Sequence, residues 1–219
     1  APDDNMLKPA SHNKKLGGKV AIKKWQHMPM YALTLEERHS CTTSCAQYTI
    51  CYGNNMPFAK RHDHNDPAFF KKLAQSIQAV SSQKKNADGF VVRLHVLGDF
   101  FSEKYVSAWQ SALIKHQGLR VFGYTHHRHD SPIGKRIAGL NQLYPDRFQV
   151  RFSDDMDTQF RARVIQGTYD KSLKHFTTYD TQQLSTDELV CPEQLGKTSG
   201  CSTCGYCWSS KKPIVFLAH

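Results

Sequence analysis

The chain has 219 residues, of which 39% are hydrophobic and 22% charged. This length allows one domain that buries its own core without disulfide bonds. The sequence has no apolar run of about eighteen residues and no charged-then-apolar leader, so it predicts neither a membrane span nor secretion. We therefore expect a cytoplasmic protein that does not enter a membrane.

The chain is basic, with a formal charge of +10 and a pI of about 9.3, from 29 Lys and Arg against 19 Asp and Glu. Such an excess attracts polyanions through counterion release, so nucleic acid is a permitted partner. The alternative is a solvated surface, because the basic residues also occur as Lys-Lys pairs along the chain, starting at Lys14, Lys23, Lys71, Lys84 and Lys211.

Residues 1–29 are predicted to form an N-terminal arm, basic and interrupted by Gly17-Gly18, with a short strand-like stretch at Val20–Ile22. Residues 30–35 are apolar and predict a strand that leads directly into a cysteine-rich loop. The next segment, 52–64, contains Gly, Asn and Pro and is expected to be irregular.

Strand and helix signals then alternate. Helices are predicted at about 67–80, 102–113 and 132–143, because apolar residues recur there at helical spacing behind capping residues or proline. Strands are predicted at 90–97, 119–125 and 148–152, and each ends in polar residues. Beyond 159 the signal weakens, with short strands possible at 163–165 and 175–179, a helical turn at 187–189 and a last strand at 213–217.

Alternating strands and helices predict an α/β fold, in which a parallel sheet closes partly into a TIM-like barrel. An open doubly wound sheet is the alternative. We expect an arm at 1–29, a partial barrel core at 30–190, and a cysteine-rich C-terminal extension at 191–219 that includes the last strand.

The seven cysteines form two groups at the ends of the chain, with none between them. The first group is Cys41, Cys45 and Cys51, and its close spacing favours thiolate ligands in a reducing compartment over disulfides. Three cysteines that hold an iron–sulfur cubane leave one iron open, whereas structural zinc requires four ligands, for which His39, His62 or His64 could supply the fourth.

The second group is Cys191, Cys201, Cys204 and Cys207. Four thiolates can complete either a zinc site or a second iron–sulfur cluster. The two successive two-residue gaps favour iron–sulfur, because ferredoxin-like loops use that spacing. A cluster with four cysteine ligands would relay electrons or organise the C-terminal segment.

A three-cysteine loop after the first strand, a helix, and a second strand ending in Leu97-Gly98-Asp99 resembles the radical S-adenosylmethionine superfamily. The segments 34–41, 51–55 and 95–101 also resemble a family of phage and bacterial proteins of unassigned function. The superfamily has three and then two residues between its cysteines, with an aromatic before the last one. Here the second gap is five residues, and the aromatic, Tyr52, follows Cys51.

The superfamily resemblance implies a partial barrel of six strand–helix units, (βα)6, and a four-iron, four-sulfur cluster at the first cysteine group. It implies that S-adenosylmethionine binds the open iron and that Gly98 and Asp99 hold its methionine end. Tyr52, Ser153 and Asp155 are further candidate cofactor-binding residues. The implied reaction generates a 5′-deoxyadenosyl radical that modifies an unidentified substrate, with an external electron donor.

Two other functions fit the residues. The first is a non-enzymatic nucleic-acid-binding protein with two zinc or iron–sulfur sites. The second is an iron–sulfur nuclease that acts through the loop of His126, His127, His129 and Asp130, with Asp99, Asp154 and Asp155 as candidate acidic metal ligands. The sequence identifies no catalytic residue for any of these functions.

Overall fold

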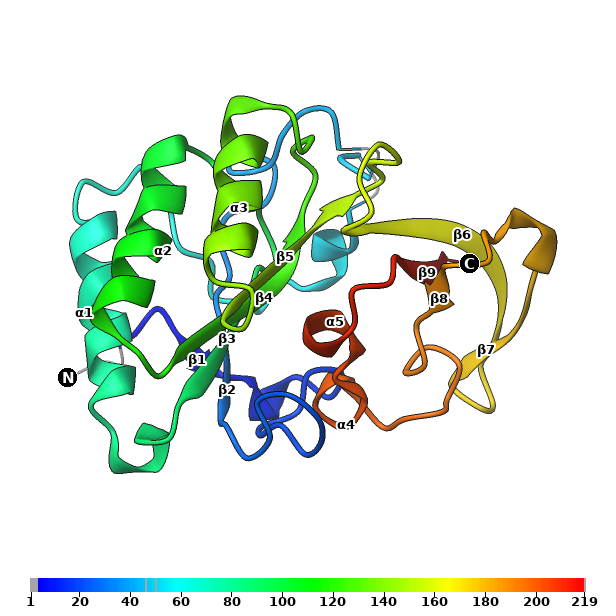
Figure 1. Cartoon of the computed structure of the whole chain (residues 1–219), viewed down its shortest axis with the longest axis horizontal. Helices are drawn as coiled ribbons and strands as arrows, with labels where there is room; N and C mark the ends of the chain where they lie inside the picture. The colour runs from blue at the N-terminus through cyan, green and yellow to red at the C-terminus, as the bar shows by residue number, and fades with distance from the viewer. Residues whose placement is uncertain (1–3, 46, 50, 219) are drawn as a thin grey trace.

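In a computed structural model of the chain, which describes residues 4–45, 47–49 and 51–218, one mixed sheet spans the molecule (Figure 1). Its nine strands are β1 (Lys8–Pro9), β2 (Met30–Ala32), β3 (Phe90–Leu94), β4 (Leu119–Thr125), β5 (Phe148–Ser153), β6 (Arg161–Asp170), β7 (His175–Tyr179), β8 (Leu189–Val190) and β9 (Ile214–Ala218). The order across the sheet is β1-β2-β3-β4-β5-β6-β9-β8, with β7 paired to β6.

The strands from β2 to β6 pair in parallel in chain order, and β6–β9 and β9–β8 are parallel as well. β1 and β7 pair antiparallel with their neighbours. Because the chain advances one strand at a time from β2 to β5, the ends of these strands lie along one edge of the sheet. The cysteine loop and the polar strand ends predicted from the sequence meet at this edge.

Three long helices lie side by side on one face of the sheet (Figure 1): α1 (Phe69–Ser81), α2 (Glu103–Lys115) and α3 (Pro132–Leu143). Ser102 and Ser131 start α2 and α3, because their side chains accept hydrogen bonds from the backbone amides of Tyr105 and Gly134. Pro132 fits the first turn of α3, where no amide donor is needed. The three predicted helices are confirmed.

The shorter helices lie in the connections. They are the 3₁₀ turns η1 (Ala10–His12), η2 (Tyr52–Asn55), η3 (Lys84–Asn86) and η4 (Thr181–Gln183), and the single-turn helices α4 (Cys201–Cys204) and α5 (Tyr206–Ser209). The sequence analysis did not predict α4 and α5. The described part of the chain contains no helix long and apolar enough to cross a membrane.

The prediction of a partial (βα)6 TIM-like barrel is wrong. The sheet is mixed, its edge strands β1 and β8 do not pair with each other, and the strand–helix alternation stops after α3. The physical reason lies in residues 161–179, which lack a helical apolar stripe and form the long strand β6 and the hairpin partner β7 instead. The α/β character stands, as an open sheet with its long helices on one face.

Other differences are local. The predicted strand at 20–22 is absent, and only an isolated bridge pairs Lys19 with Pro29. The strand predicted at 90–97 ends at Leu94, whereas β6 is longer than expected and β8 replaces the helical turn at 187–189. Strands from 1–29 and from 191–219 join the same sheet as the core, and the division into three domains stays a prediction.

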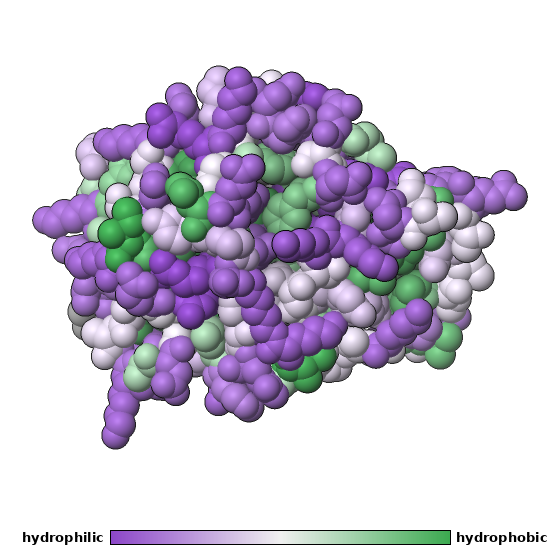
Figure 2. All heavy atoms as spheres, in the orientation of Figure 1, coloured by the Kyte–Doolittle hydropathy of each residue, from purple (hydrophilic) through white to green (hydrophobic). Residues whose placement is uncertain are grey.

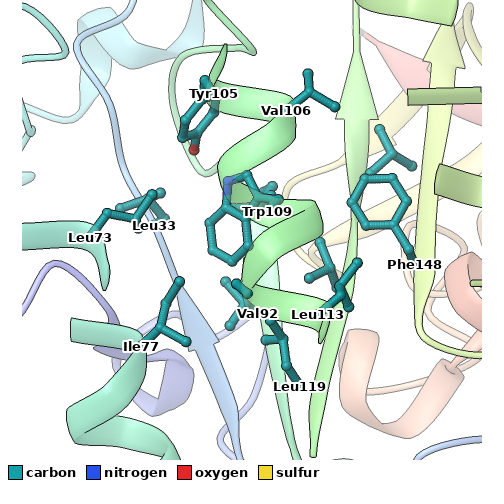
Figure 3. Close-up of a cluster of buried hydrophobic side chains, with 14 of the residues drawn as sticks. Leu33, Leu73, Ile77, Val92, Tyr105, Val106, Trp109, Leu113, Leu119 and Phe148 are labelled. Carbon is teal, nitrogen blue, oxygen red and sulfur yellow. The ribbon is translucent and has the colours of Figure 1, made fainter. Parts of the chain in front are cut away.

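The main core fills the space between the sheet and α1–α3 (Figure 3). Trp109 of α2 lies at its centre and is fully buried among the aliphatic side chains of the neighbouring helices and strands. Replacing Trp109 with Ala removes the largest of these side chains, so we expect a loss of about 3–5 kcal/mol in the free energy of unfolding. Urea denaturation measures it.

Ile114, also in α2, provides the control, since its side chain is 60% exposed. Ile114→Ala is expected to change the free energy of unfolding by less than about 0.5 kcal/mol. Equal effects of the two substitutions would contradict the packing described for α2.

The other face of the sheet is covered by the N-terminal segment and by α4 and α5. The rings of Trp25 and Trp208 stack with centroids 5.7 Å apart, and Phe122 of β4 packs against Trp208. The two terminal segments are also joined by hydrogen bonds, because the amide of Ala21 donates to the carbonyl of Ser202 and the indole of Trp208 to that of Lys24. The chain ends therefore form one layer.

Glu188, next to β8, is fully buried between two arginines of β6. Its carboxylate lies 2.7 Å from Arg163 Nη2 and 3.3 Å from Arg161 Nη2. The hydrogen bond from Arg163 lowers the pKa of Glu188 to about 2. This pair therefore stabilises the fold above the ordinary pKa of a glutamate, and its contribution is lost as the pH falls toward 2.

We expect this one group to account for about 2 kcal/mol of the stability that the protein loses between pH 6 and pH 3. Glu188→Gln, which does not titrate, should lose that much less stability over the same interval. Urea unfolding of both proteins at the two pH values measures the difference. Parallel pH dependence of the two proteins would contradict the ion pair.

Candidate functional site

The first cysteine loop begins just after β2 and is fastened to the chain that follows β3. The amide of Leu35 donates to the carbonyl of Leu97, and the amide of Asp99 donates to the Ser40 hydroxyl at 3.3 Å. Gly98 permits this close approach: its φ is +87°, and a Cβ there would lie 2.5 Å from Ser40 Oγ. Gly98 thus brings Cys41, the next residue after Ser40, against the end of β3.

All three cysteines of this loop line one small cavity of about 150 Å³. The other side of this cavity is formed by the chain after β3, from His95 to Asp99, together with Tyr52, Tyr124 and His126. The three thiols are free of disulfides. The three cysteines therefore border one volume together with Gly98 and Asp99, and their role as cluster ligands stays a prediction.

The surroundings of these thiols suit ligands better than nucleophiles. Burial, together with Asp99 and the neighbouring thiols, raises the pKa of Cys41 to about 11. A catalytic thiolate requires surroundings that lower the pKa of its thiol. A bound metal would instead compensate the thiolate charge. The amide of Gly53 also donates to Cys51 Sγ at 3.4 Å, a contact of the kind that tunes iron–sulfur centres.

His95 lines the small cavity and carries a buried ring nitrogen without a partner among the described residues. His95 is 4% exposed, and its Nε2 is hydrogen-bonded to the Tyr105 hydroxyl at 2.8 Å. Its Nδ1 has no hydrogen-bond partner among the described residues. Burial lowers the pKa of His95 to about 3, so the ring is neutral at physiological pH. An orphaned buried nitrogen beside three thiols fits a site that takes a polar cofactor.

The second cysteine group lines a larger cavity of about 720 Å³. Cys201 and Cys204 begin and end α4, Cys207 lies in α5, and Cys191 follows β8. Gly205, at φ +65°, makes the turn between α4 and α5 that returns Cys207 toward the other thiols. Burial raises the pKa of Cys191 to about 12 and raises the pKa of Cys201 as well.

The two cavities share a wall, since Gln47, Tyr52, Arg93, Val96, Tyr124 and His126 line both. Tyr124 of β4 belongs to this shared wall, and its hydroxyl donates to Cys207 Sγ at 2.6 Å. The guanidinium of Arg93 lies 4.8 Å from the centre of the Tyr124 ring. The seven cysteines therefore border two adjacent cavities, three thiols in the small one and four in the larger one.

Some of the other predicted site residues reach this space and others do not. Tyr52 lines both cavities, and its hydroxyl donates to the carbonyl of Val96. Ser153 lines the larger cavity. Asp155 lines neither, because its carboxylate binds the backbone and ring of His129 at 2.8 Å each. Its predicted position beside a cofactor is therefore not reproduced.

Asp99 lines the small cavity, but its carboxylate already accepts two backbone hydrogen bonds, from Phe100 at 2.7 Å and from His126 at 2.8 Å. It therefore ties the end of β3 to the end of β4. The histidine loop is dispersed: His126 lines both cavities, His127 contacts the carbonyl of Phe100, and His129 pairs with Asp155. Asp130 is exposed and paired with Arg128.

Within the described ranges, no group of three or more His, Cys, Asp and Glu is arranged to hold a single metal ion. The donor set nevertheless fits iron–sulfur clusters, because the irons of a cubane occupy separate corners and their ligands stand farther apart than those of one ion. Among the three residues considered as a fourth zinc ligand, His62 forms a β-bridge with Leu35, and the ring of His64 packs at a tilted angle against Phe101. None of the three lines either cavity.

The sequence analysis missed Arg93, Tyr124, Arg151 and Lys15. Arg93 and Arg151 each interrupt an apolar strand, and a charged residue in the middle of a buried strand is a signal that could have found them. Tyr124 and Lys15 carry no comparable signal, because an aromatic in a strand and a lysine in a basic segment are common.

The comparisons with known proteins concern sequence alone, because no solved structure matches. Two curated relatives are the Gene 88 proteins of Mycobacterium phages D29 and L5, each 26% identical, over 133 and 132 residues respectively. The alignments cover 57% of this chain and 53% of each relative, so the chain spans about half the length of the curated relatives it matches. The model of the Gene product 88 family matches residues 5–210, and the chain belongs to that family.

Proposed function

We propose that the protein is an iron–sulfur enzyme of the radical S-adenosylmethionine type. In this proposal Cys41, Cys45 and Cys51 hold a catalytic four-iron, four-sulfur cluster, and the four C-terminal cysteines hold a second, auxiliary one. The observation that carries it is the pair of adjacent cavities, one bordered by three free thiols and the other by four.

The open sheet is compatible with this function. Parallel α/β sheets bind ligands outside the C-terminal ends of their strands, and the two cavities lie at the ends of β3, β4 and β5. Only three thiols line the small cavity, so a cluster held there would keep one iron without a protein ligand, and S-adenosylmethionine would bind at that iron. When bound, a reduced cluster supplies one electron to the sulfonium, whose carbon–sulfur bond breaks to give methionine and a 5′-deoxyadenosyl radical.

The residues of the chain have separate roles in this proposal. Gly98 and the Ser40–Asp99 hydrogen bond hold the cysteine loop at the strand ends. His95 offers its unpartnered Nδ1 to the polar part of the cofactor, and Tyr52 covers the boundary of the two cavities. Tyr124 and Arg93 lie in the wall between the two clusters. The substrate would be held in the larger cavity. The proposal places the protein in a reducing compartment such as the cytoplasm, where an external donor supplies electrons.

The test is anaerobic reconstitution with iron and sulfide, followed by incubation with S-adenosylmethionine and dithionite. We expect 5′-deoxyadenosine and methionine to appear in equal amounts, even without substrate. A protein that carries its full complement of iron and releases neither product would refute the enzymatic function. A protein that instead binds two zinc ions and no iron would favour the binding-protein alternative.

A further inference from the structure

We propose that the substrate is a nucleic acid, whose phosphates bind a basic surface formed by the two terminal segments and one of whose bases enters the larger cavity. That the bound nucleic acid is a substrate rests on the proposed function. The basic surface is defined by seven exposed lysines: Lys14, Lys15, Lys19, Lys23, Lys197, Lys211 and Lys212.

The charge of the chain is concentrated in these segments. Residues 5–35 and 194–219 contain nine of the 29 Lys and Arg residues and none of the 19 Asp and Glu residues. They therefore account for nine of the ten excess positive charges, and the rest of the chain is nearly neutral. The Lys-Lys pairs are thus unequal in their surroundings, because the pairs at Lys71 and Lys84 lie in a part of the chain where acidic residues nearly match the basic ones in number.

The two segments lie together in space, although they are at opposite ends of the sequence (Figure 1). The amide of Cys201 donates to the carbonyl of Lys15 at 2.6 Å, and that of Ser202 to the carbonyl of Leu16 at 3.0 Å. The Lys23 ammonium lies 3.3 Å from the centre of the Tyr206 ring. The molecular surface is mainly hydrophilic in the view of Figure 2, and its apolar patches are scattered.

Most of these lysines have no carboxylate partner within the described part of the chain. Lys15 pairs with Glu193 at 3.7 Å, and the half-buried neighbour Lys24 pairs with Asp146 at 3.1 Å. No other lysine of the basic surface forms an ion pair there. Ammonium groups without carboxylate partners are available to phosphates, and phosphate binding is favoured because it releases counterions. The backbone that carries these lysines is already ordered by the contacts between the two terminal segments.

The basic surface continues into the larger cavity through Lys15, which lines it. The wall of this cavity includes the aromatic residues Tyr52, Phe122, Tyr124, Tyr206 and Phe216 and the cation Arg93, together with the carboxylates of Asp154 and Glu193 and the four cysteines. Arg93 has no carboxylate partner in the described residues. Its guanidinium lies 4.8 Å from the centre of the Tyr124 ring and 5.6 Å from that of Phe122. Aromatic rings beside cations bind unstacked bases, and about 720 Å³ is enough for one nucleotide.

A nucleic acid fits these observations better than an acidic protein. Phosphates along a strand match lysines spread over a surface, and flat bases match the aromatic cavity that opens beside them. An acidic peptide would use the lysines but leave the aromatic cavity without a planar group.

The test measures binding apart from catalysis. Fluorescein-labelled single-stranded RNA, single-stranded DNA and duplex DNA, each about 20 nucleotides long, are titrated with the full chain, and fluorescence anisotropy is followed at several salt concentrations. The variant carries Lys14→Gln, Lys19→Gln, Lys211→Gln and Lys212→Gln. The control carries Lys71→Gln, Lys84→Gln, Lys115→Gln and Lys135→Gln, which are exposed lysines of the helical side with the same total charge.

We expect the wild type and the control to bind a single strand with similar affinity, and the variant to bind at least about tenfold more weakly. The slope of log K against log salt should shrink by about 0.7 for each phosphate contact that is lost. The preference between RNA and DNA identifies the kind of strand. Circular dichroism of both variants shows that the fold is retained.

Equal weakening of both variants, tighter binding of duplex than of single strands, or binding only to an acidic polypeptide such as polyglutamate would overturn the inference. Failure of this inference is distinct from failure of the proposed function. A protein that cleaves S-adenosylmethionine but binds no oligonucleotide would refute only the proposed substrate class. A protein that binds a single strand without cleaving S-adenosylmethionine would support the nucleic-acid-binding surface and refute the enzymatic function.

Discussion

Cys51→Ser is expected to halve the iron content of the anaerobically reconstituted protein, from about eight to about four atoms per chain, because it removes one of the three ligands of the first cluster. Formation of 5′-deoxyadenosine should fall below detection, since the remaining cluster has no open iron. The measurements are iron and sulfide analysis together with product analysis by chromatography. Cys51 lies in the wall of the small cavity, so its substitution leaves the larger cavity intact.

The control is Thr43→Ala in the same loop, at an exposed position that lines neither cavity. It should retain both the iron and the activity of the wild type. If Cys51→Ser keeps all its iron, the first cysteine group does not act as a cluster site. If Cys51→Ser loses all its iron, the two cysteine groups do not bind their clusters independently.

Arg151→Met is expected to lower the free energy of unfolding by about 3 kcal/mol or more, because it removes a buried guanidinium that donates to three backbone carbonyl groups. Arg151 is fully buried in β5 and donates to the carbonyls of Cys207, Ser210 and Lys212. Its guanidinium lies 4.4 Å from the centre of the Phe160 ring. Burial lowers the pKa of Arg151, and the fold tolerates this charge only while the carbonyls solvate it.

The same substitution should release the C-terminal cysteine segment from the sheet, so the iron bound at the second group is lost while the first cluster remains. Urea denaturation and iron analysis measure the two effects. Arg136→Met is the control: Arg136 is half-exposed and pairs only with Glu103 and Ser107, so its loss should change stability by less than about 1 kcal/mol. A stable Arg151→Met protein with full iron would contradict the role of Arg151.

The middle of the fold could be predicted from sequence because local signals agree there. Helix caps, proline at a first turn and an apolar stripe coincide in α2 and α3, and the predicted strands β4 and β5 are apolar between turns. The prediction of a barrel was wrong because closure depends on residues 159–190. There the polar and apolar residues follow neither the helical period nor the strand period clearly. The pairing of β6 with β9 joins segments separated by about fifty residues, and local patterns carry no information on it.

The candidate site was partly readable. The spacing of the cysteines predicted two groups, and the polar ends of β3, β4 and β5 predicted the edge at which the first group lies. That the two groups border adjacent cavities depends on how the terminal segments pack across the sheet, through Trp25 and Trp208, and the sequence alone gives no register for such packing. The place of Asp155 outside both cavities could not be read for the same reason, because its partner His129 comes from a different loop.

The most direct test of the central claim is the iron, sulfide and zinc content of the full chain purified and handled without air. Two cubane clusters predict about eight iron and eight sulfide ions per chain, with negligible zinc and a brown colour. A colourless protein with two zinc ions and no sulfide would contradict the account, since the seven thiols would then serve structure rather than redox chemistry.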